Sequence, residues 1–110
     1  MAQLNDIIKD IIQPFITRLI NNGIRINAVY LFGSYAKRKE NEWSDIDIAV
    51  ISPDFTDSRL NERIKLTIIA SEIDNRIEPV PFRPGTFVID DPLVWEIKTT
   101  GIPINLQETN

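Results

Sequence analysis

The amino-acid sequence predicts an α/β fold in which a mixed β-sheet is packed on one side by helices. Short apolar segments with strand character alternate with helical segments along the 110 residues, and this close spacing favours an α/β sandwich over a helical bundle. A hydrophobic content of 43% is enough to fill one core in a chain of this length. The sequence contains no linker or repeat, so we expect residues 1–110 to form a single domain.

The first expected element is a long helix over residues 3–22. Apolar residues recur there at helical spacing, at Leu4, Ile7, Ile8, Ile11, Ile12, Phe15, Ile16, Leu19 and Ile20. Pro14 should kink this helix or split it near Gln13, because proline has no amide hydrogen to donate. Asn22-Gly23 fits a helix C-terminus. We expect the apolar stripe to pack on the sheet of the same chain rather than on another protein.

The next segment, 28–32, is apolar and predicts a strand that runs into Gly33-Ser34. Residues 35–39 can follow as a short helix whose N-terminal amides face this turn. Glycine lets the backbone approach a ligand closely, so such a turn can hold phosphate groups. A Gly-Ser pair at a strand end is more often an ordinary turn, and it does not identify a site by itself.

A second strand, 46–51, is expected beside Asp45 and Asp47, with ten residues between Ser34 and the first of these carboxylates. The strand period of two puts both carboxylates on one face and the neighbouring isoleucines on the other. Carboxylates side by side repel each other unless a cation lies between them, so the pair predicts a divalent metal site. Taken alone, an Asp-x-Asp sequence is more often a solvated strand edge.

A loop at 53–57 precedes a second long helix, which should run through about residue 73 with Asp57 or Ser58 as its N-terminal cap. The periodicity of its apolar positions is less clean than in the first helix. We expect its apolar face to consist of Leu60, Ile64, Leu66, Ile68 and Ile69.

Residues 76–82 predict a third strand, and residues 92–99 predict a last helix that stops at Gly101. Pro79 and Pro81 cannot donate backbone hydrogen bonds. This strand should therefore lie at a sheet edge or have an interrupted ladder.

The Gly33-Ser34 turn followed by Asp45 and Asp47 resembles the motif order of the nucleotidyltransferases of the polymerase-beta superfamily. The chain looks most like their smallest members, the minimal (MNT-type) nucleotidyltransferases, and the resemblance covers nearly its whole length. It implies the small nucleotidyltransferase fold and the transfer of a nucleoside monophosphate from a nucleoside triphosphate, with pyrophosphate leaving.

The resemblance also implies roles for individual residues. Asp45 and Asp47 would bridge two Mg²⁺ ions about 4 Å apart, although Mn²⁺ would fit too. Glu78, on the third strand, would be the third metal ligand and would complete the ion that activates the attacking hydroxyl. Gly33 and Ser34 would hold the phosphates of ATP or another nucleoside triphosphate.

Two parts of the chain depart from the family pattern. Lys37 would help to neutralise the triphosphate, but Lys37 and Arg38 stand where relatives commonly have Arg and Gly, which makes the connector less pliant. Glu78 stands where the family more often has Asp. An exposed glutamate on an edge strand is the alternative interpretation of Glu78.

Other candidate residues have structural explanations. Acidic residues at helix ends and turns are explained by capping, and these are Asp74, Asp90 and Asp91. Ser44 fits a turn residue before the acidic strand. Trp43 could stack on a base or act as a packing lid.

Composition excludes several kinds of chemistry. The sequence has no His and no Cys, which excludes His-ligated zinc, His-based catalytic triads, disulfides and thiolate chemistry. A net charge of −4 argues against a general nucleic-acid binder. The sequence has no apolar run long enough to cross a membrane and no basic leader, so we expect a cytoplasmic protein.

The resemblance to minimal nucleotidyltransferases also implies a partner. They are typically encoded beside a helical HEPN-type protein, a ribonuclease toxin for which the nucleotidyltransferase is the antitoxin. The expected activity is therefore transfer of AMP from ATP to a hydroxyl of this partner. The alternatives are a weakly active or inactive antitoxin that acts by binding alone, and an enzyme that modifies a small molecule or an RNA end with help from another subunit or a homo-oligomer.

Overall fold

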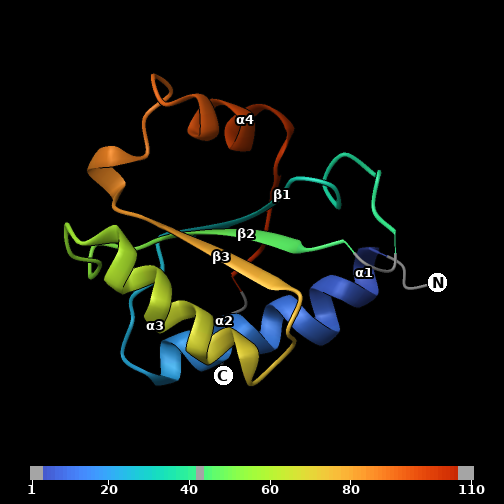
Figure 1. Ribbon diagram of the computed structural model, residues 1–110, viewed down its shortest axis with the longest axis horizontal. Coiled ribbons are helices and arrows are strands. Elements are labelled where there is room, and N and C mark those ends of the chain that lie inside the picture. The colour runs from blue at the N-terminus through green and yellow to red at the C-terminus, as the bar shows by residue number, and fades with distance from the viewer. Residues whose placement is uncertain (1–3, 42–43, 107–110) are drawn as a thin grey trace.

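The computed structural model describes residues 4–41 and 44–106, and these contain a four-stranded sheet in the order β3-β2-β1-β4 (Figure 1). The strands are β1 (Ala28–Phe32), β2 (Ile46–Ile51), β3 (Ile77–Phe82) and β4 (Ile102–Pro103). β1 is antiparallel to β2 and to β4, whereas β2 and β3 are parallel. The predicted α/β class, the mixed sheet and the first three strands are confirmed.

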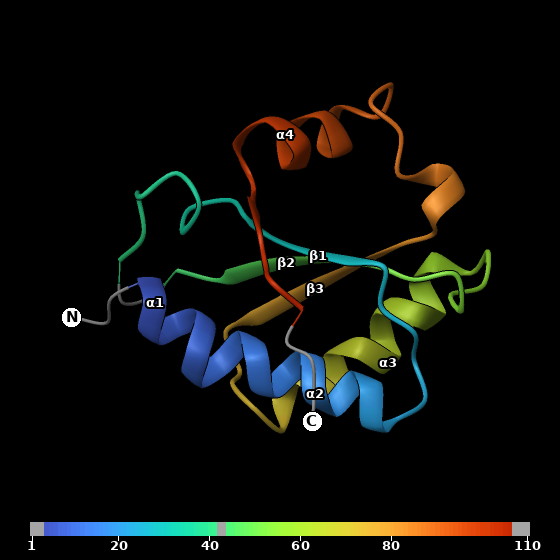
Figure 2. The ribbon, with the colours of Figure 1, turned by 180° about the vertical axis from the view of Figure 1, so that it is seen from behind.

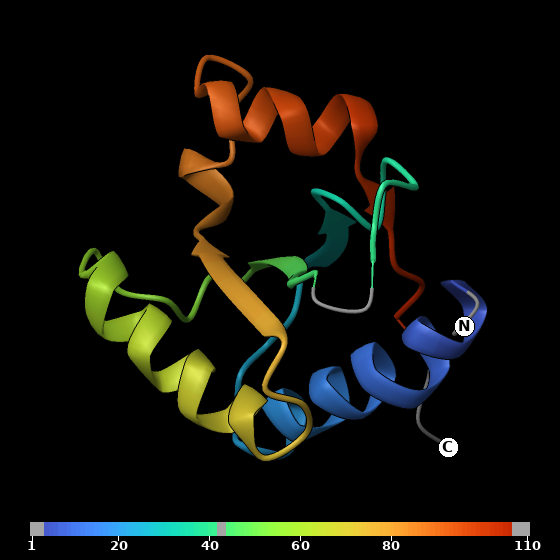
Figure 3. The same cartoon turned by 45° about the vertical axis from the view of Figure 1, so that its right-hand side comes forward.

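Helices cover both faces of this sheet (Figures 1 and 2). The helical segments are α1 (Leu4–Ile7), η1 (Ile8–Ile12), α2 (Gln13–Asn21), α3 (Arg59–Ser71), the short η2 (Pro84–Thr86) and α4 (Pro92–Thr100). Figure 3 shows the sheet between the layer formed by α1, α2 and α3 and the single helix α4. None of the helices in the described ranges is long and apolar enough to cross a membrane.

The expectation of helices on one side holds for α1 to α3, but α4 packs on the opposite face. Strand β2 explains this arrangement, because it is apolar on both faces after Asp47. Its residues Ile46, Ile48 and Val50 join the core under α2 and α3. The alternate residues Ala49 and Ile51 join a second core with buried residues of α4.

The regular α-helix at the N-terminus is interrupted just before Pro14, as predicted, but the chain stays helical from α1 through η1 to α2. Pro14 is in the first turn of α2, and the residues before it form the π-helical segment η1, in which the Gln13 amide donates to the Ile8 carbonyl. The missing amide of proline is thus accommodated by a wider turn. Phe15 and Leu19 are fully buried, which confirms that the stripe packs on the chain's own sheet.

Strand β3 lies at the sheet edge, as its prolines predict. Ile46 donates its amide to the Arg76 carbonyl (2.7 Å), and Ser52 donates to the Phe82 carbonyl (3.0 Å). In a parallel strand, the backbone N–H and C=O groups of alternate residues point toward the neighbouring strand. The even-numbered residues of β3 therefore bond to β2, whereas the backbone nitrogen atoms of Pro79 and Pro81 point away from it. No ladder bond is lost, and the outer edge lacks two donors.

The apolar face predicted for α3 is wrong for three of its residues. Leu66 and Ala70 are buried against the core. In contrast, Leu60, Ile64 and Ile68 are 70%, 48% and 60% exposed and form a separate row, which we call the α3 outer row. The imperfect periodicity of this helix arises because two of its faces are apolar.

The caps of α3 and α4 differ in how well they were predicted. Ser58, the N-cap residue of α3, makes no side-chain cap hydrogen bond, and the buried Glu62 carboxylate of the first turn accepts a hydrogen bond from the Thr56 amide before the helix (2.7 Å). Asp57 instead pairs with Arg83. At α4 the Asp91 carboxylate accepts a hydrogen bond from the Leu93 amide (2.8 Å), as a cap should.

The two faces of α3 give a stability prediction. Leu66→Ala should lower the free energy of unfolding by about 2–5 kcal/mol, because it leaves a cavity in the core. Leu60→Ala makes the same chemical change on the exposed row and should alter it by less than about 0.5 kcal/mol. Urea denaturation of both variants and the wild type measures the difference. Equal losses would contradict the assignment of the two faces.

Candidate active site

The turn after β1 lies directly against the acidic start of β2. Antiparallel pairing places Phe32 opposite Asp47, so the next residue, Gly33, is beside this carboxylate. A Cβ atom on Gly33 would be 2.1 Å from Asp47 Oδ2. Gly33 also has a φ of +73°, a conformation that side-chain-bearing residues rarely adopt. Two separate requirements, space and backbone conformation, therefore select glycine at this position.

The register of the sheet brings the predicted carboxylates to one end of one face. Asp47 is paired with Glu78 across the parallel strands β2 and β3, and the strand period places Asp45 on the same face. The described residues nevertheless contain no group of three acidic side chains arranged to hold a metal ion. Glu78 is turned to Arg63 of α3, whose Nη2 lies 3.2 Å from Glu78 Oε2.

Electrostatic repulsion marks this cluster. Burial, followed by the charges of Asp45, Glu78 and Glu96, raises the pKa of Asp47 from 3.8 to about 6, and the positive charge of Arg63 opposes the shift. Asp47 thus sits among several negative charges, and a proton or another cation relieves their repulsion. Oxygen donors of this kind suit Mg²⁺ or Mn²⁺, so the donor chemistry fits the expected metals.

Two members of the site were missed by sequence reasoning. Glu96 is on α4 and Arg63 is on α3, and neither belongs to a recognisable motif. Both reach the site only because their helices pack beside the strand ends. A weak signal was present in the sequence, since each is a charged residue next to apolar positions of a predicted helix.

The predicted short helix at 35–39 does not form. The connector consists of turns, closed by bonds from the Lys37 amide to the Gly33 carbonyl (3.1 Å) and from the Lys39 amide to the Ser34 carbonyl (2.9 Å). Arg38 has a φ of +59°, which ends any helical continuation. The nucleotidyltransferases that the sequence resembles commonly have Gly at this position. Arg38 therefore adopts a backbone conformation that glycine would adopt more easily.

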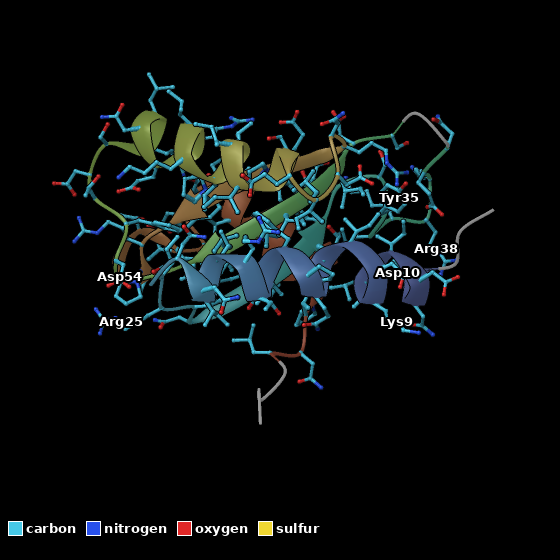
Figure 4. All side chains as sticks on the ribbon, turned by 90° about the horizontal axis from the view of Figure 1, so that it is seen from below. Lys9, Asp10, Arg25, Tyr35, Arg38 and Asp54 are labelled. Atoms are coloured by element: carbon cyan, nitrogen blue, oxygen red, sulfur yellow. The ribbon has the colours of Figure 1, made fainter. Side chains whose placement is uncertain are left out.

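The side chain of Lys37 already has an acidic partner. Its Nζ lies 3.4 Å from Glu96 Oε2, with both side chains partly exposed. Figure 4 shows Tyr35 and Arg38 of the same connector at the end of the molecule where Lys9 and Asp10 lie. Lys37 is therefore a cation of the connector that contacts the acidic cluster.

The remaining candidate residues have structural roles, but Asp74 pairs with Arg76 instead of capping a helix as predicted. Asp74 pairs with Arg76 (3.1 Å), and hydrogen bonds from Arg76 lower the pKa of this carboxyl group. Ser44 closes a turn, because its Oγ accepts a hydrogen bond from the Asn41 amide (2.9 Å). Asp90 lies in an exposed turn before α4. Trp43 lies outside the described residues.

The chain is similar in sequence to a known family and to a curated protein. Residues 15–108 match the family described as polymerase beta nucleotidyltransferase. The protein adenylyltransferase MntA of Shewanella oneidensis strain MR-1 is 31% identical over 98 residues, which are 89% of this chain and 66% of that protein. The chain thus spans just under two thirds of the length of this curated relative.

Solved structures with the same fold include two toxin–antitoxin structures. One is a toxin–antitoxin with AMP-PNP, with a TM-score of 0.63 and 28% identity over 87% of this chain and 74% of the other. Another is a mutant MntA–HpeT toxin–antitoxin, with a TM-score of 0.61 and 27% identity over 97% and 76%. A nucleotidyltransferase from Sulfolobus solfataricus has a TM-score of 0.62 at 15% identity over 94% and 87%, which shows the fold alone.

The contact between Gly33 and Asp47 gives a prediction with an internal control. Gly33→Ala should lower the free energy of unfolding by about 1–2 kcal/mol through backbone strain. It should also abolish Mn²⁺–ATP binding, because Asp47 must move away from the added methyl group. Gly23→Ala is the control, since Gly23 has a φ of +85° but no atom near its Cβ position. Calorimetric titration should find binding retained in Gly23→Ala, and equal binding by both variants would contradict the prediction.

The raised pKa of Asp47 gives a prediction about pH. The folded state binds this proton more tightly than the unfolded state, so ionised Asp47 costs stability above about pH 6, and the cost disappears below pH 3.8. In metal-free buffer at pH 7.5, Asp47→Asn should be more stable than the wild type by on the order of 1 kcal/mol, after allowance for solvent screening. The gain should shrink from pH 6 to pH 4 in urea denaturation.

Asp54→Asn is a comparison variant that should change stability in the opposite direction from Asp47→Asn. Arg25 donates hydrogen bonds to Asp54 (Figure 4), and these lower the pKa of the Asp54 carboxyl group. Its contribution to stability is present at neutral pH and lost in acid, so Asp54→Asn should be less stable than the wild type at pH 7.5. A loss of stability in Asp47→Asn at the same pH would contradict the repulsion described for the cluster.

Proposed function

The chain belongs to the polymerase beta nucleotidyltransferase family, and we propose that it transfers the AMP moiety of ATP to a hydroxyl group of a partner protein. The observation that carries this proposal is the contact of Gly33 with Asp47, in an acidic cluster that also involves Asp45 and Glu78. A phosphate-binding turn and metal-binding carboxylates must be neighbours for this reaction. The 31% identity to a protein adenylyltransferase supports the choice of AMP.

In this proposal Asp45 and Asp47 would hold two Mg²⁺ or Mn²⁺ ions, and Glu78 would be the third carboxylate ligand. Bound metal ions supply charge stabilisation for the attacking and the leaving oxygen. Gly33 and Ser34 position the phosphates through the turn, and Lys37 exchanges Glu96 for a phosphate oxygen.

The reaction is an in-line displacement at the α-phosphorus. The acceptor hydroxyl oxygen forms a bond to this phosphorus, the bond to the bridging oxygen breaks, and pyrophosphate leaves. Glu78 is the candidate for the group that accepts the proton of the hydroxyl, because it lies at the edge strand where an acceptor can approach. To do so, its carboxylate must separate from Arg63, with which it pairs in the free chain.

The proposed acceptor is a HEPN-type helical protein, with the chain as the antitoxin of a cytoplasmic toxin–antitoxin pair. Structures of toxin–antitoxin complexes are among the similar folds at 27–28% identity, and one of them contains AMP-PNP.

A direct test is AMP transfer between purified proteins. The chain is incubated with ATP, Mg²⁺ and its proposed HEPN-type partner, and the partner is analysed by intact mass. We expect the partner to gain the mass of one or more AMP groups. The variant Asp45→Asn with Asp47→Asn should transfer none, because it removes both bridging carboxylates.

The second candidate function is neutralisation by binding alone. It is favoured by two observations, the pairing of Glu78 with Arg63 and the left-handed arginine at position 38. If the double variant still neutralises the toxic partner in cells, and the wild type transfers no AMP, binding is the function. Transfer by the wild type and loss of neutralisation in the double variant would exclude it.

A further inference from the structure

The α3 outer row is an apolar surface that the fold of this chain does not use. Leu60, Ile64 and Ile68 are four residues apart and therefore lie along one side of the helix. Together with Arg63 and Thr67 they line a shallow hollow on the outside of α3. Isolated exposed apolar residues are common, but a continuous row around a hollow is typical of a protein interface.

Basic side chains surround this row, although the chain as a whole carries a net charge of −4. Arg63 and Lys65 are exposed on α3, whereas the acidic residue of the helix, Glu62, is buried with its carboxylate 3.8 Å from Lys65. Pairing of two α3 helices about a twofold axis would bring like charges together. The charge pattern instead fits a different protein that presents an apolar ridge flanked by acidic side chains.

The outer row is also connected to the acidic cluster. Arg63 lines the hollow, and its guanidinium is the group that pairs with Glu78 at 3.2 Å. The two side chains are 49% and 43% exposed, so the pair is solvent-screened and easily exchanged. An acidic side chain placed in the hollow would compete with Glu78 for Arg63 and would release the Glu78 carboxylate toward Asp47.

We infer that the α3 outer row is the docking surface for the protein that carries the acceptor hydroxyl, and that docking frees Glu78 by engaging Arg63. The inference rests on the proposed function, which it deepens by placing the acceptor protein on a defined face. Docking thus makes the Glu78 carboxylate available only when the acceptor protein is present. This limits ATP turnover by the free chain.

The test compares two exposed isoleucines. Ile64→Glu places a negative charge within the outer row, and Ile89→Glu makes the same change at a 57% exposed position before α4. Binding to the HEPN-type partner is measured by calorimetry, and AMP transfer by intact mass. We expect Ile64→Glu to weaken binding by about tenfold or more, as loss of a central interface residue does, and Ile89→Glu to behave as the wild type.

The outcomes separate this inference from the proposed function. Wild-type affinity in Ile64→Glu would overturn the docking surface even if AMP transfer occurs. A wild type that binds the partner through the row but transfers no AMP would contradict the proposed function and keep the docking surface. A homodimer of the chain alone that dissociates in Ile64→Glu, seen by sedimentation, would assign the row to a second copy and overturn the inference.

The proposed link between partner docking and release of Glu78 runs through Arg63, and Lys65 on the same helix provides a control. Arg63→Gln and Lys65→Gln each remove one positive charge, but only Arg63 contacts Glu78. Addition of the partner should tighten Mn²⁺ binding to the wild type and to Lys65→Gln severalfold. In Arg63→Gln, the free chain should already bind Mn²⁺ tightly and gain little from the partner. Equal behaviour of the two variants would overturn the coupling.

Discussion

The close approach of the β1 turn to the carboxylate of Asp47 is the constraint on which the site depends. It requires glycine at position 33, and it requires β2 to be in the one register that places Asp47 opposite Phe32. A shift by one residue would turn every β2 side chain to the other face and put an isoleucine against the turn. Burial of Ile46 and Ile48 fixes this register. The burial of apolar side chains that stabilises the sheet therefore also positions Asp47 beside Gly33.

The acidic cluster carries a cost that two ion pairs partly offset. The ionised form of Asp47 is destabilised by burial and by the charges around it, while Arg63 pairs with Glu78 and Lys37 pairs with Glu96. Both pairs are partly exposed, and pairs of this kind contribute only about 0–1 kcal/mol each. They hold the side chains in place without competing strongly against a metal ion or a triphosphate. The proposed binding of metal ions and a triphosphate would therefore cost little in lost ion pairs.

Sequence reasoning succeeded where the determinants are local and failed where they are tertiary. The strand, glycine turn and acidic strand are contiguous, so their placement follows from strand periodicity. Glu96 and Arg63 reach the site through helix packing, which no spacing rule reports. The short helix at 35–39 failed because Arg38 takes a left-handed conformation. The α3 face was misassigned because apolar residues on a surface row and in the core look alike in sequence.

The sheet edge next to the site limits how a protein acceptor can approach. β3 is an edge strand, and an edge normally offers backbone donors and acceptors to an incoming strand. Pro79 and Pro81 remove the outward-facing donors, and Arg59 Nε already contacts the outward Pro81 carbonyl (3.4 Å). Strand addition at this edge is therefore disfavoured. Under the proposed function, a protein that delivers a hydroxyl to Glu78 would be recognised by side chains, and α3 presents such side chains beside β3.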